Sequence, residues 1–266
     1  MSAVAQTLAA CRAQGRAALI GYLPVGYPDL AGSVDAMRAM VEAGVDIVEV
    51  GVPYSDPLMD GPVIQHAAEV ALAGGTKVSD AFTATAALAE VGAPSVVMTY
   101  WNLVLRRGVE RFAAALAAAG GSGLITPDLI PDEAGEWLAA SDRHGLDRVF
   151  LVAPSSTTER LASVTAACRG FVYAASTMGV TGARTSVGQA AEGLVRHTRE
   201  VTDLPVCVGL GVSTGAQARQ VGEYADGVIV GSALVRCLVD AADPAEGLDR
   251  IRVLVSELAE GVRSSR

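Results

Sequence analysis

Lysine and histidine are scarce in this sequence of 266 residues. Lys77 is the only lysine, and His66, His144 and His197 are the only histidines. An enzyme that forms a Schiff base, or binds pyridoxal phosphate covalently, needs a lysine in its active site, yet Lys77 lies in GGTKVSD, between two segments of helical periodicity. No histidine shares a loop at the end of a predicted strand with a second clear metal ligand. We therefore expect neither amine catalysis nor a metal site in this chain.

Charged and aromatic residues and cysteine are also sparse. Charged residues make up 18% of the chain and aromatic residues 5%, against 51% hydrophobic residues, which predicts a globular protein. The positive residues are scattered through a chain of net charge -9, and no apolar run reaches about 18 residues, so neither nucleic acid nor a membrane is an expected partner. Cys11, Cys168, Cys207 and Cys237 form no CxxC motif, and we expect buried thiols.

The N-terminal segment lacks the charged stretch and apolar core of a secretory signal. We expect a short helix that leads into the first strand, and a cytoplasmic location. The alternative is a transit peptide, because Arg12 and Arg16 precede the first acidic residue, Asp29.

Short apolar runs rich in valine, isoleucine and leucine predict eight strands. They span residues 18–24, 46–52, 95–100, 123–127, 148–153, 170–175, 205–210 and 227–231. Helical periodicity lies between them, and strands that are apolar on both faces are typical of parallel sheets. We predict an α/β fold, a single (β/α)8 TIM barrel over residues 1–266 with a parallel eight-stranded core and an extra N-terminal helix. A doubly wound sheet is the alternative, although the first turn, GYLPVGYPD, lacks the GxGxxG fingerprint.

Two carboxylates stand out at the second strand and the loop after it. Glu49 interrupts an apolar strand and shares side-chain parity with Ile47 and Gly51. Burial raises the pKa of a carboxyl group and suits it to proton transfer; the alternative is a carboxylate satisfied by backbone donors. Asp60 precedes Gly61-Pro62 and is a candidate both for a second acid of the same site and for a helix cap, two roles that do not exclude each other.

Glycine-rich turns follow the seventh and eighth strands. Gly209, Gly211, Gly231 and Ser232 lie where barrels often bind phosphate, because backbone N–H groups of such turns and of a helix N-terminus point at the anion. The alternative is a role in packing alone. The loop that contains Arg184 is long enough to close over the same phosphate, but a solvated Arg184 is equally compatible with the sequence.

Six blocks of sequence resemble the alpha subunit family of tryptophan synthase. They are EVGVPYSDPLMDGP (49–62), MTYWN (98–102), PDLIPDE (127–133), VYAASTMGVTG (172–182), VGLGVS (208–213) and VGSALV (230–235). They occur in the family's order and at its spacing across nearly the whole chain. The first and fourth blocks are highly specific, whereas the glycine turns alone are weak signals.

The resemblance implies a lyase of tryptophan biosynthesis, an aromatic amino acid pathway, that cleaves indole-3-glycerol phosphate to indole and glyceraldehyde 3-phosphate. The family's catalytic carboxylates fall on Glu49 and Asp60. Its phosphate site falls on Gly182, Gly209, Gly211, Gly231 and Ser232, its indole pocket on Tyr22, Met98, Tyr100, Tyr173 and Leu210, and Thr181 joins the substrate-binding set. Tyr22 and Leu210 stand where the family often has phenylalanine, which affects the shape of the pocket and not the reaction.

The resemblance also implies a partner, the pyridoxal-phosphate-containing beta subunit, in an alpha2beta2 heterotetramer of order alpha-beta-beta-alpha that channels indole. No cofactor is expected in this chain. The loops around Asp56, Pro57, Asn102, Leu103 and Pro131 are expected to dock the partner, and the alternative is ordinary loop surface.

Carbon–carbon cleavage next to a hydroxyl group needs an electron sink, and indole itself supplies one once its C3 atom is protonated. We expect Glu49 to protonate C3 and then to remove the proton of the neighbouring hydroxyl group, while Asp60 accepts the indole N–H.

Two other functions remain compatible with the sequence. One is a different phosphate-binding barrel, such as an indole-glycerol-phosphate synthase or a phosphoribosyl isomerase, and the other is a catalytically silent, phosphate-binding regulatory subunit.

Overall fold

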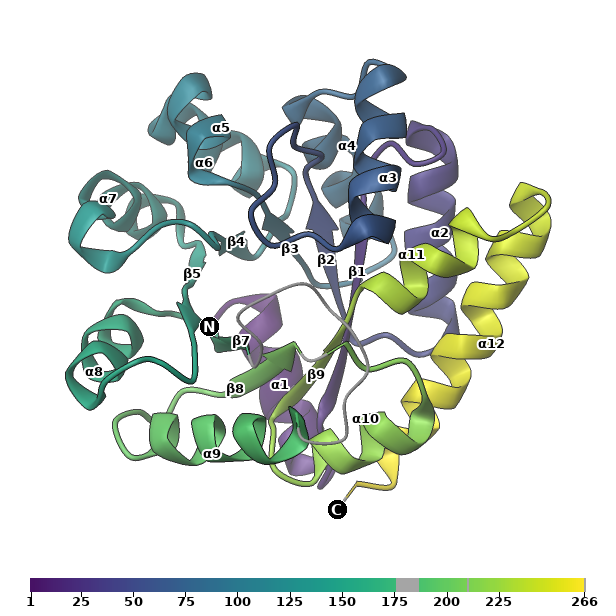
Figure 1. The fold of residues 1–266 in the computed structure, drawn as a ribbon. Helices are drawn as coiled ribbons and strands as arrows, with labels where there is room; N and C mark the ends of the chain where they lie inside the picture. Colours follow the sequence, from purple (N-terminus) through teal and green to yellow (C-terminus); the bar gives the residue numbers. More distant parts are fainter. Residues whose placement is uncertain (176–186, 210, 266) are drawn as a thin grey trace.

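Parallel strands ringed by helices make up the protein in this computed structural model (Figure 1), which describes residues 1–175, 187–209 and 211–265. The strands are β1 (Ala18–Pro24), β2 (Ile47–Gly51), β3 (Ser95–Met98), β4 (Gly123–Ile125), β5 (Asp147–Val149), β6 (Leu151–Val152), β7 (Val172–Ala175), β8 (Val206–Gly209) and β9 (Gly227–Val230). They pair in the order β5-β4-β3-β2-β1-β9-β8-β7-β6, and neighbouring strands run parallel. The eight predicted strand positions are confirmed.

β5 and β6 are two halves of the predicted fifth strand, separated by Phe150. β5 pairs with β4, and β6 pairs with β7. The Phe150 carbonyl accepts a hydrogen bond from the Tyr173 N–H at 3.2 Å, so the chain stays bonded across the break. The nine short strands therefore occupy eight strand positions of the barrel, and the position shared by β5 and β6 closes it.

The helices surround the strands in Figure 1 and cover their outer face. They are α1 (Ala3–Ala13), α2 (Leu30–Ala43), α3 (Pro62–Ala73), α4 (Val78–Glu90), α5 (Trp101–Arg107), α6 (Val109–Ala118), the 3-10 turn η1 (Pro131–Glu133), α7 (Gly135–His144), α8 (Thr158–Ala167), α9 (Val187–Arg199), α10 (Gly215–Gly222), α11 (Ser232–Val239) and α12 (Pro244–Arg263). Polar residues begin several of them: the side chains of Asp29, Thr157, Thr214 and Asp243 each accept a backbone N–H from the first turn.

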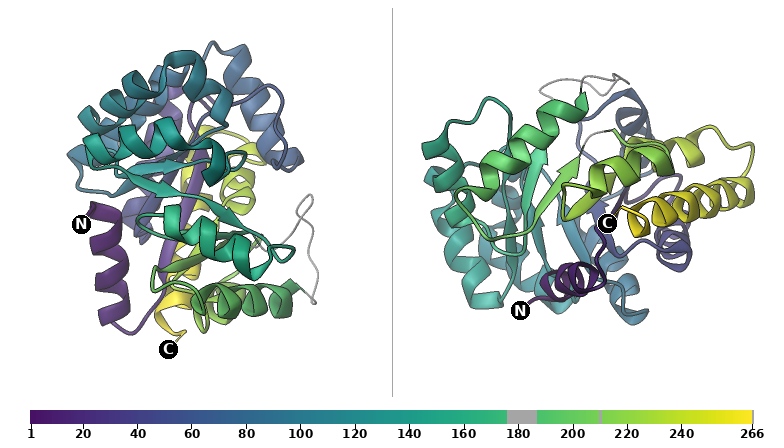
Figure 2. Two further views of the ribbon diagram at one scale, coloured as in Figure 1. Left: turned by 90° about the vertical axis from the view of Figure 1, so that its left-hand side faces the viewer. Right: turned by 90° about the horizontal axis from the view of Figure 1, so that it is seen from below.

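The barrel interior is apolar at the end where the strands begin. It is filled by inward-facing side chains from successive strands, among them Ile20, Ile47, Val96, Ile125, Val149, Cys207 and Ile229. The predicted N-terminal helix, α1, packs Val4, Leu8 and Cys11 against this cluster and lies across this end of the barrel (Figure 2). The Ser2 hydroxyl, which caps α1, also donates to the buried Asp147 carboxylate at the start of β5. Because α1 covers this end, polar chemistry is left to the carboxyl ends of the strands.

The four cysteines are free thiols, as the sequence predicts. Cys11, Cys168 and Cys207 are buried, but Cys237 on α11 is only half-buried, so the expectation of burial is wrong for that residue.

Within the described ranges no helix is long and apolar enough to cross a membrane.

Candidate active site

Glu49 lies in the middle of β2 and is completely buried. Among the residues that the structure describes, neither of its carboxylate oxygens has a hydrogen-bond partner, so the alternative in which backbone donors satisfy it is wrong. Burial without compensation disfavours the charged form and raises the pKa of Glu49 to about 8. At neutral pH the group is therefore a protonated acid, and its proton has no acceptor in the described part of the chain.

Two tyrosines flank this acid. Tyr22 of β1 is in register with Glu49, and Tyr173 comes from β7 across the barrel. The pKa of each phenol is raised, first by burial and further by the nearby Glu49 and Asp60 charges. Two glycines make room for the rings: a Cβ atom on Gly51 would lie 2.4 Å from the Tyr22 hydroxyl oxygen, and one on Gly209 would lie 2.4 Å from that of Tyr173. The phenols, Glu49 and Asp60 therefore form one electrostatic cluster.

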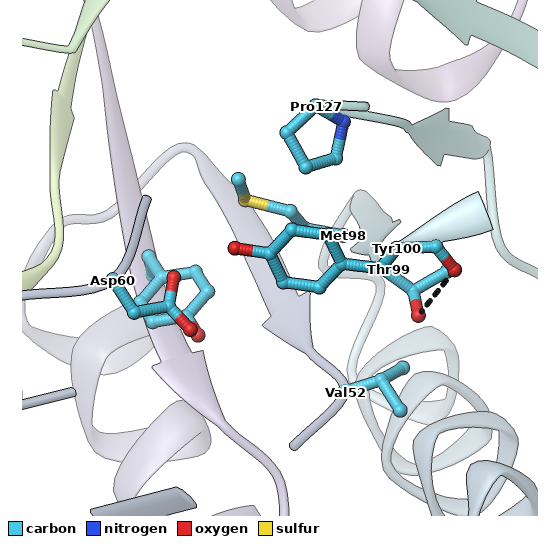
Figure 3. A pocket seen from close by; sticks show the side chains of 7 residues that line it. Val52, Asp60, Met98, Thr99, Tyr100 and Pro127 are labelled. Atoms are coloured by element: carbon cyan, nitrogen blue, oxygen red, sulfur yellow. Dashed lines mark hydrogen bonds between the residues drawn. The ribbon is translucent and has the colours of Figure 1, made fainter. Parts of the chain in front are cut away.

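Asp60 lies in loop 52–61, between β2 and α3. The cap of α3 is Gly61, which makes no side-chain cap hydrogen bond, so the interpretation of Asp60 as a helix cap is wrong. Burial raises the pKa of Asp60 to about 6. Asp60 lines a pocket at the carboxyl ends of the strands together with Tyr22, Val52, Met98, Thr99, Tyr100 and Pro127. Figure 3 shows Asp60 on one side of this pocket and Met98, Tyr100 and Pro127 opposite.

The Tyr100 hydroxyl holds loop 52–61 over the pocket. It accepts the backbone N–H groups of Leu58 at 2.9 Å and Met59 at 3.1 Å, and the Tyr54 ring stacks on the Tyr100 ring at 4.8 Å between centroids. The open volume beneath is about 10 Å³, about the size of one water molecule. This volume is smaller than a bicyclic ring, so the pocket must widen before such a ring can enter.

Sequence reasoning missed four residues here: Val52, Thr99, Pro127 and Tyr54. All four belong to blocks that it had singled out, 49–62, 98–102 and 127–133. Strand alternation would have turned Val52 and Thr99 away from the pocket. Their contribution arises because the strands end there and the chain turns into loops.

The glycine turns after β8 and β9 meet at one edge of the pocket, because these strands are neighbours. Gly209 ends β8, and Gly211 has φ +70°, in the left-handed region that favours glycine. Gly231 precedes α11, which begins at Ser232 without a side-chain cap hydrogen bond, so backbone donors at the positive end of this helix are left for an anion. The expected substrate residues Thr181, Gly182 and Leu210, and also Arg184, lie outside the described residues.

The predicted docking residues lie on three segments that follow β2, β3 and β4: loop 52–61, helix α5 and residues 126–133. Asp56 and Asn102 are exposed, and Pro57, Leu103 and Pro131 are half-buried. Large apolar side chains are exposed on the same segments: Leu58 at 80%, Leu105 at 51%, Met59 at 44% and Ile130 at 40%.

Polar contacts tie these three segments together. Asn102 Nδ2 donates to the Tyr54 hydroxyl at 3.4 Å, and the Trp101 N–H donates to the Asp128 carboxylate at 2.9 Å. The segments thus form one surface of exposed apolar side chains with a polar margin, which is typical of a protein–protein contact. We call this surface, made of loop 52–61, α5 and residues 126–133, the docking face.

The single lysine stands apart from the pocket. Lys77 is exposed at the start of α4 and is absent from the pocket lining. Within residues 1–175, 187–209 and 211–265, no three His, Cys, Asp or Glu side chains are grouped so that they could hold a metal ion.

Comparison with known proteins identifies close relatives. The family model described as tryptophan synthase alpha chain matches residues 8–263. The tryptophan synthase alpha chain of Mycobacterium marinum is 66% identical over 253 residues, which is 95% of this chain and 92% of that protein. That of Nocardia farcinica is 62% identical over 99% of this chain and 97% of its own length.

Solved structures give the same result. A chain of tryptophan synthase from Mycobacterium tuberculosis superposes with a TM-score of 0.93 at 62% identity, and 98% of each chain is covered. Tryptophan synthase subunit alpha from Legionella pneumophila reaches a TM-score of 0.89 at 30% identity, again with 98% of each chain covered. These likenesses confirm the barrel fold.

Proposed function

The chain belongs to the tryptophan synthase alpha chain family, and we propose that Glu49 and Asp60 carry out in it the family's lyase reaction, the cleavage of indole-3-glycerol phosphate to indole and glyceraldehyde 3-phosphate. The observation that carries the proposal is the Glu49 carboxyl group. It is completely buried, has no hydrogen-bond partner within residues 1–175, 187–209 and 211–265, and keeps its proton at neutral pH. A group in this state is suited to give a proton to a substrate.

Glu49 first protonates indole C3, which converts the ring into an iminium ion that accepts electrons. The resulting carboxylate then removes the proton of the hydroxyl group on the attached carbon. As the aldehyde forms, the bond from that carbon to C3 breaks and its electron pair returns to the ring. Indole and glyceraldehyde 3-phosphate leave, and Glu49 regains its proton, so the cycle needs no external oxidant or reductant.

Asp60 supports this step from loop 52–61, where it lines the pocket. Its pKa of about 6 leaves it ionised at neutral pH, so it accepts the indole N–H and stabilises the positive charge that develops there. Tyr22, Met98, Tyr100 and Tyr173 would bound the indole ring, together with Leu210. This division of labour between a protonated and an ionised carboxyl group follows from their different burial.

The phosphate of the substrate is assigned to the turns after β8 and β9. Gly209, Gly211, Gly231 and Ser232 would bind it through backbone N–H groups at the start of α11, together with Thr181 and Gly182 from the loop after β7. We also assign residues 1–266 to one domain, since the matched region, 8–263, contains all the strands.

The partner is the beta subunit of tryptophan synthase, which carries the pyridoxal phosphate of the alpha2beta2 complex; the relatives from M. tuberculosis are structures of tryptophan synthase. We assign its contact to the docking face, including Asp56, Pro57, Asn102, Leu103 and Pro131. The exposed apolar side chains there support the assignment.

A cytoplasmic location completes the proposal, because a phosphorylated substrate does not cross a bilayer and must be made in the same compartment.

Indole release from indole-3-glycerol phosphate, measured with and without the beta subunit, tests this function. We expect slow release by the chain alone and faster release on mixing. No release under either condition would favour a silent regulatory subunit or a different phosphate-binding barrel, and release without stimulation would count against the partner.

A further inference from the structure

Three arginine side chains line a cleft of about 330 Å³ where α5 meets α6: Arg106, Arg107 and Arg111. Gly108 joins the two helices with φ +89°, a left-handed conformation that turns the chain sharply. A Cβ atom on Gly108 would lie only 3.2 Å from Arg111 Nε, so Arg111 folds back against this junction. Three cations are thereby gathered in one concavity.

These arginines lack counter-charges within the described part of the chain. None of the three takes part in the ion pairs found there. The nearest acid on α6, Glu110, is held by Arg143 and His144 instead. Like charges in one cleft repel each other. The chain has a net charge of -9 and therefore an excess of acidic residues, yet none of those described pairs with these arginines. A concentration of unpaired positive charge therefore points to an anionic partner from outside.

Arg107 is held firmly although it is unpaired. Its guanidinium lies 4.9 Å from the centroid of the Phe82 ring, which packs edge-on against Phe112. Its Nε atom is buried and has no hydrogen-bond partner among the residues that the structure describes. A guanidinium fixed on an aromatic platform loses little freedom when it binds a carboxylate, and its planar fork matches that group.

The cleft borders the docking face, because α5 carries both. Asn102 and Leu103 lie at its start, the exposed Leu105 follows, and Arg106 and Arg107 end the helix. We propose that this arginine cleft receives an acidic, carboxylate-bearing segment of the beta subunit. The inference rests on the proposed docking face and adds to it an electrostatic margin that steers association.

The test is the charge-reversal variant Arg106→Glu/Arg111→Glu, which leaves Arg107 on its aromatic platform. We expect its Kd for the beta subunit, measured by calorimetry at low salt, to rise roughly tenfold or more, and the difference from wild type to shrink as salt screens the charges. Indole release by the isolated variant should stay unchanged. The matched control is Arg12→Glu/Arg219→Glu, which changes the net charge equally at exposed sites on α1 and α10.

Two further measurements separate the possible failures. If Arg106→Glu/Arg111→Glu binds the beta subunit as tightly as the control while Leu58→Asp loses binding, the docking face stands and the arginine inference is overturned. If Leu58→Asp also binds normally, the docking face is wrong too. If inorganic pyrophosphate binds wild type but not the arginine variant, and the Kd for the beta subunit is unchanged, the cleft is a small-anion site and the proposal fails.

Discussion

Tyr22 and Glu49 are register partners on the adjacent strands β1 and β2, and both side chains lie inside the barrel. Gly51, two residues after Glu49, clears the space that the Tyr22 ring occupies. The Glu49 charge contributes to the raised pKa of the Tyr22 phenol. The buried acid has no hydrogen-bond partner in the described part of the chain, which leaves its proton for the substrate.

Replacing the acid itself should remove catalysis and spare binding. In Glu49→Gln the side chain keeps its shape but cannot transfer a proton, so we expect indole release to fall by about 10² to 10⁴-fold. Substrate affinity, measured by calorimetric titration, should change little. Turnover close to that of wild type would refute the assignment.

Asp60→Asn should act on the transition state more than on the bound substrate. The interaction with the indole N–H strengthens as positive charge develops, so kcat should fall strongly while KM changes less. Steady-state kinetics of indole release at pH 7 decides this. An effect confined to KM would show that Asp60 only binds.

Activity should follow a bell-shaped pH profile. The mechanism needs Asp60 ionised and Glu49 protonated, so kcat/KM should rise as pH passes about 6 and fall as it passes about 8. The two carboxyl groups share one site, so the two apparent pKa values of the profile are properties of the pair and not of either residue alone. Asp60→Asn should flatten the acid limb and keep the alkaline one; a profile that is level from pH 5 to 9 would contradict both assignments.

Burial of Glu49 should also make stability depend on pH. The pKa is about 8 in the folded chain against an ordinary 4.5, so between these values the unfolded chain ionises while the folded chain stays protonated. The free energy of unfolding should therefore fall as pH rises from 4.5 to about 8, by roughly 3 to 5 kcal/mol.

Urea denaturation of wild type and Glu49→Gln across this range measures the effect. The stability of the variant relative to wild type should grow with pH. Asp56→Asn, which changes an exposed acid in the neighbouring loop, is the control and should show no such trend. A constant difference between Glu49→Gln and wild type would mean that the pKa of Glu49 is not raised.

Gly51→Ala should disturb the site through Tyr22. The added Cβ atom would lie 2.4 Å from the Tyr22 hydroxyl oxygen, so the ring must move, at a cost of about 1–3 kcal/mol in the free energy of unfolding. Activity should fall with it. Adding Tyr22→Leu should restore stability, measured by thermal or urea unfolding.

Gly188→Ala is the matched control for Gly51→Ala. A Cβ atom on this α9 residue meets nothing within 4 Å. It should therefore leave stability unchanged or raise it slightly. Equal losses in the two variants would show that the Tyr22 contact is not the cause.

The sequence alone determined the barrel and the identity of the buried acid. Apolar runs between helical segments predict eight parallel strands, and strand alternation points Glu49 to the same side as Ile47. Both signals are local, because the period of a strand or helix is set by its own backbone. The family resemblance added the pocket residues Tyr22, Met98 and Tyr100, which the structure brings to the same end of the barrel as Asp60.

Only the tertiary structure decided what surrounds these groups. It shows that Glu49 lacks a hydrogen-bond partner among the described residues, that Asp60 is no helix cap, and that the Tyr100 hydroxyl binds the backbone of loop 52–61. It also gathers Arg106, Arg107 and Arg111 around the turn at Gly108. Alternation along a strand tells which side a residue faces, but its neighbours come from other strands and loops. Their positions depend on the register of every strand and on how the closed barrel packs, which no single segment of sequence encodes.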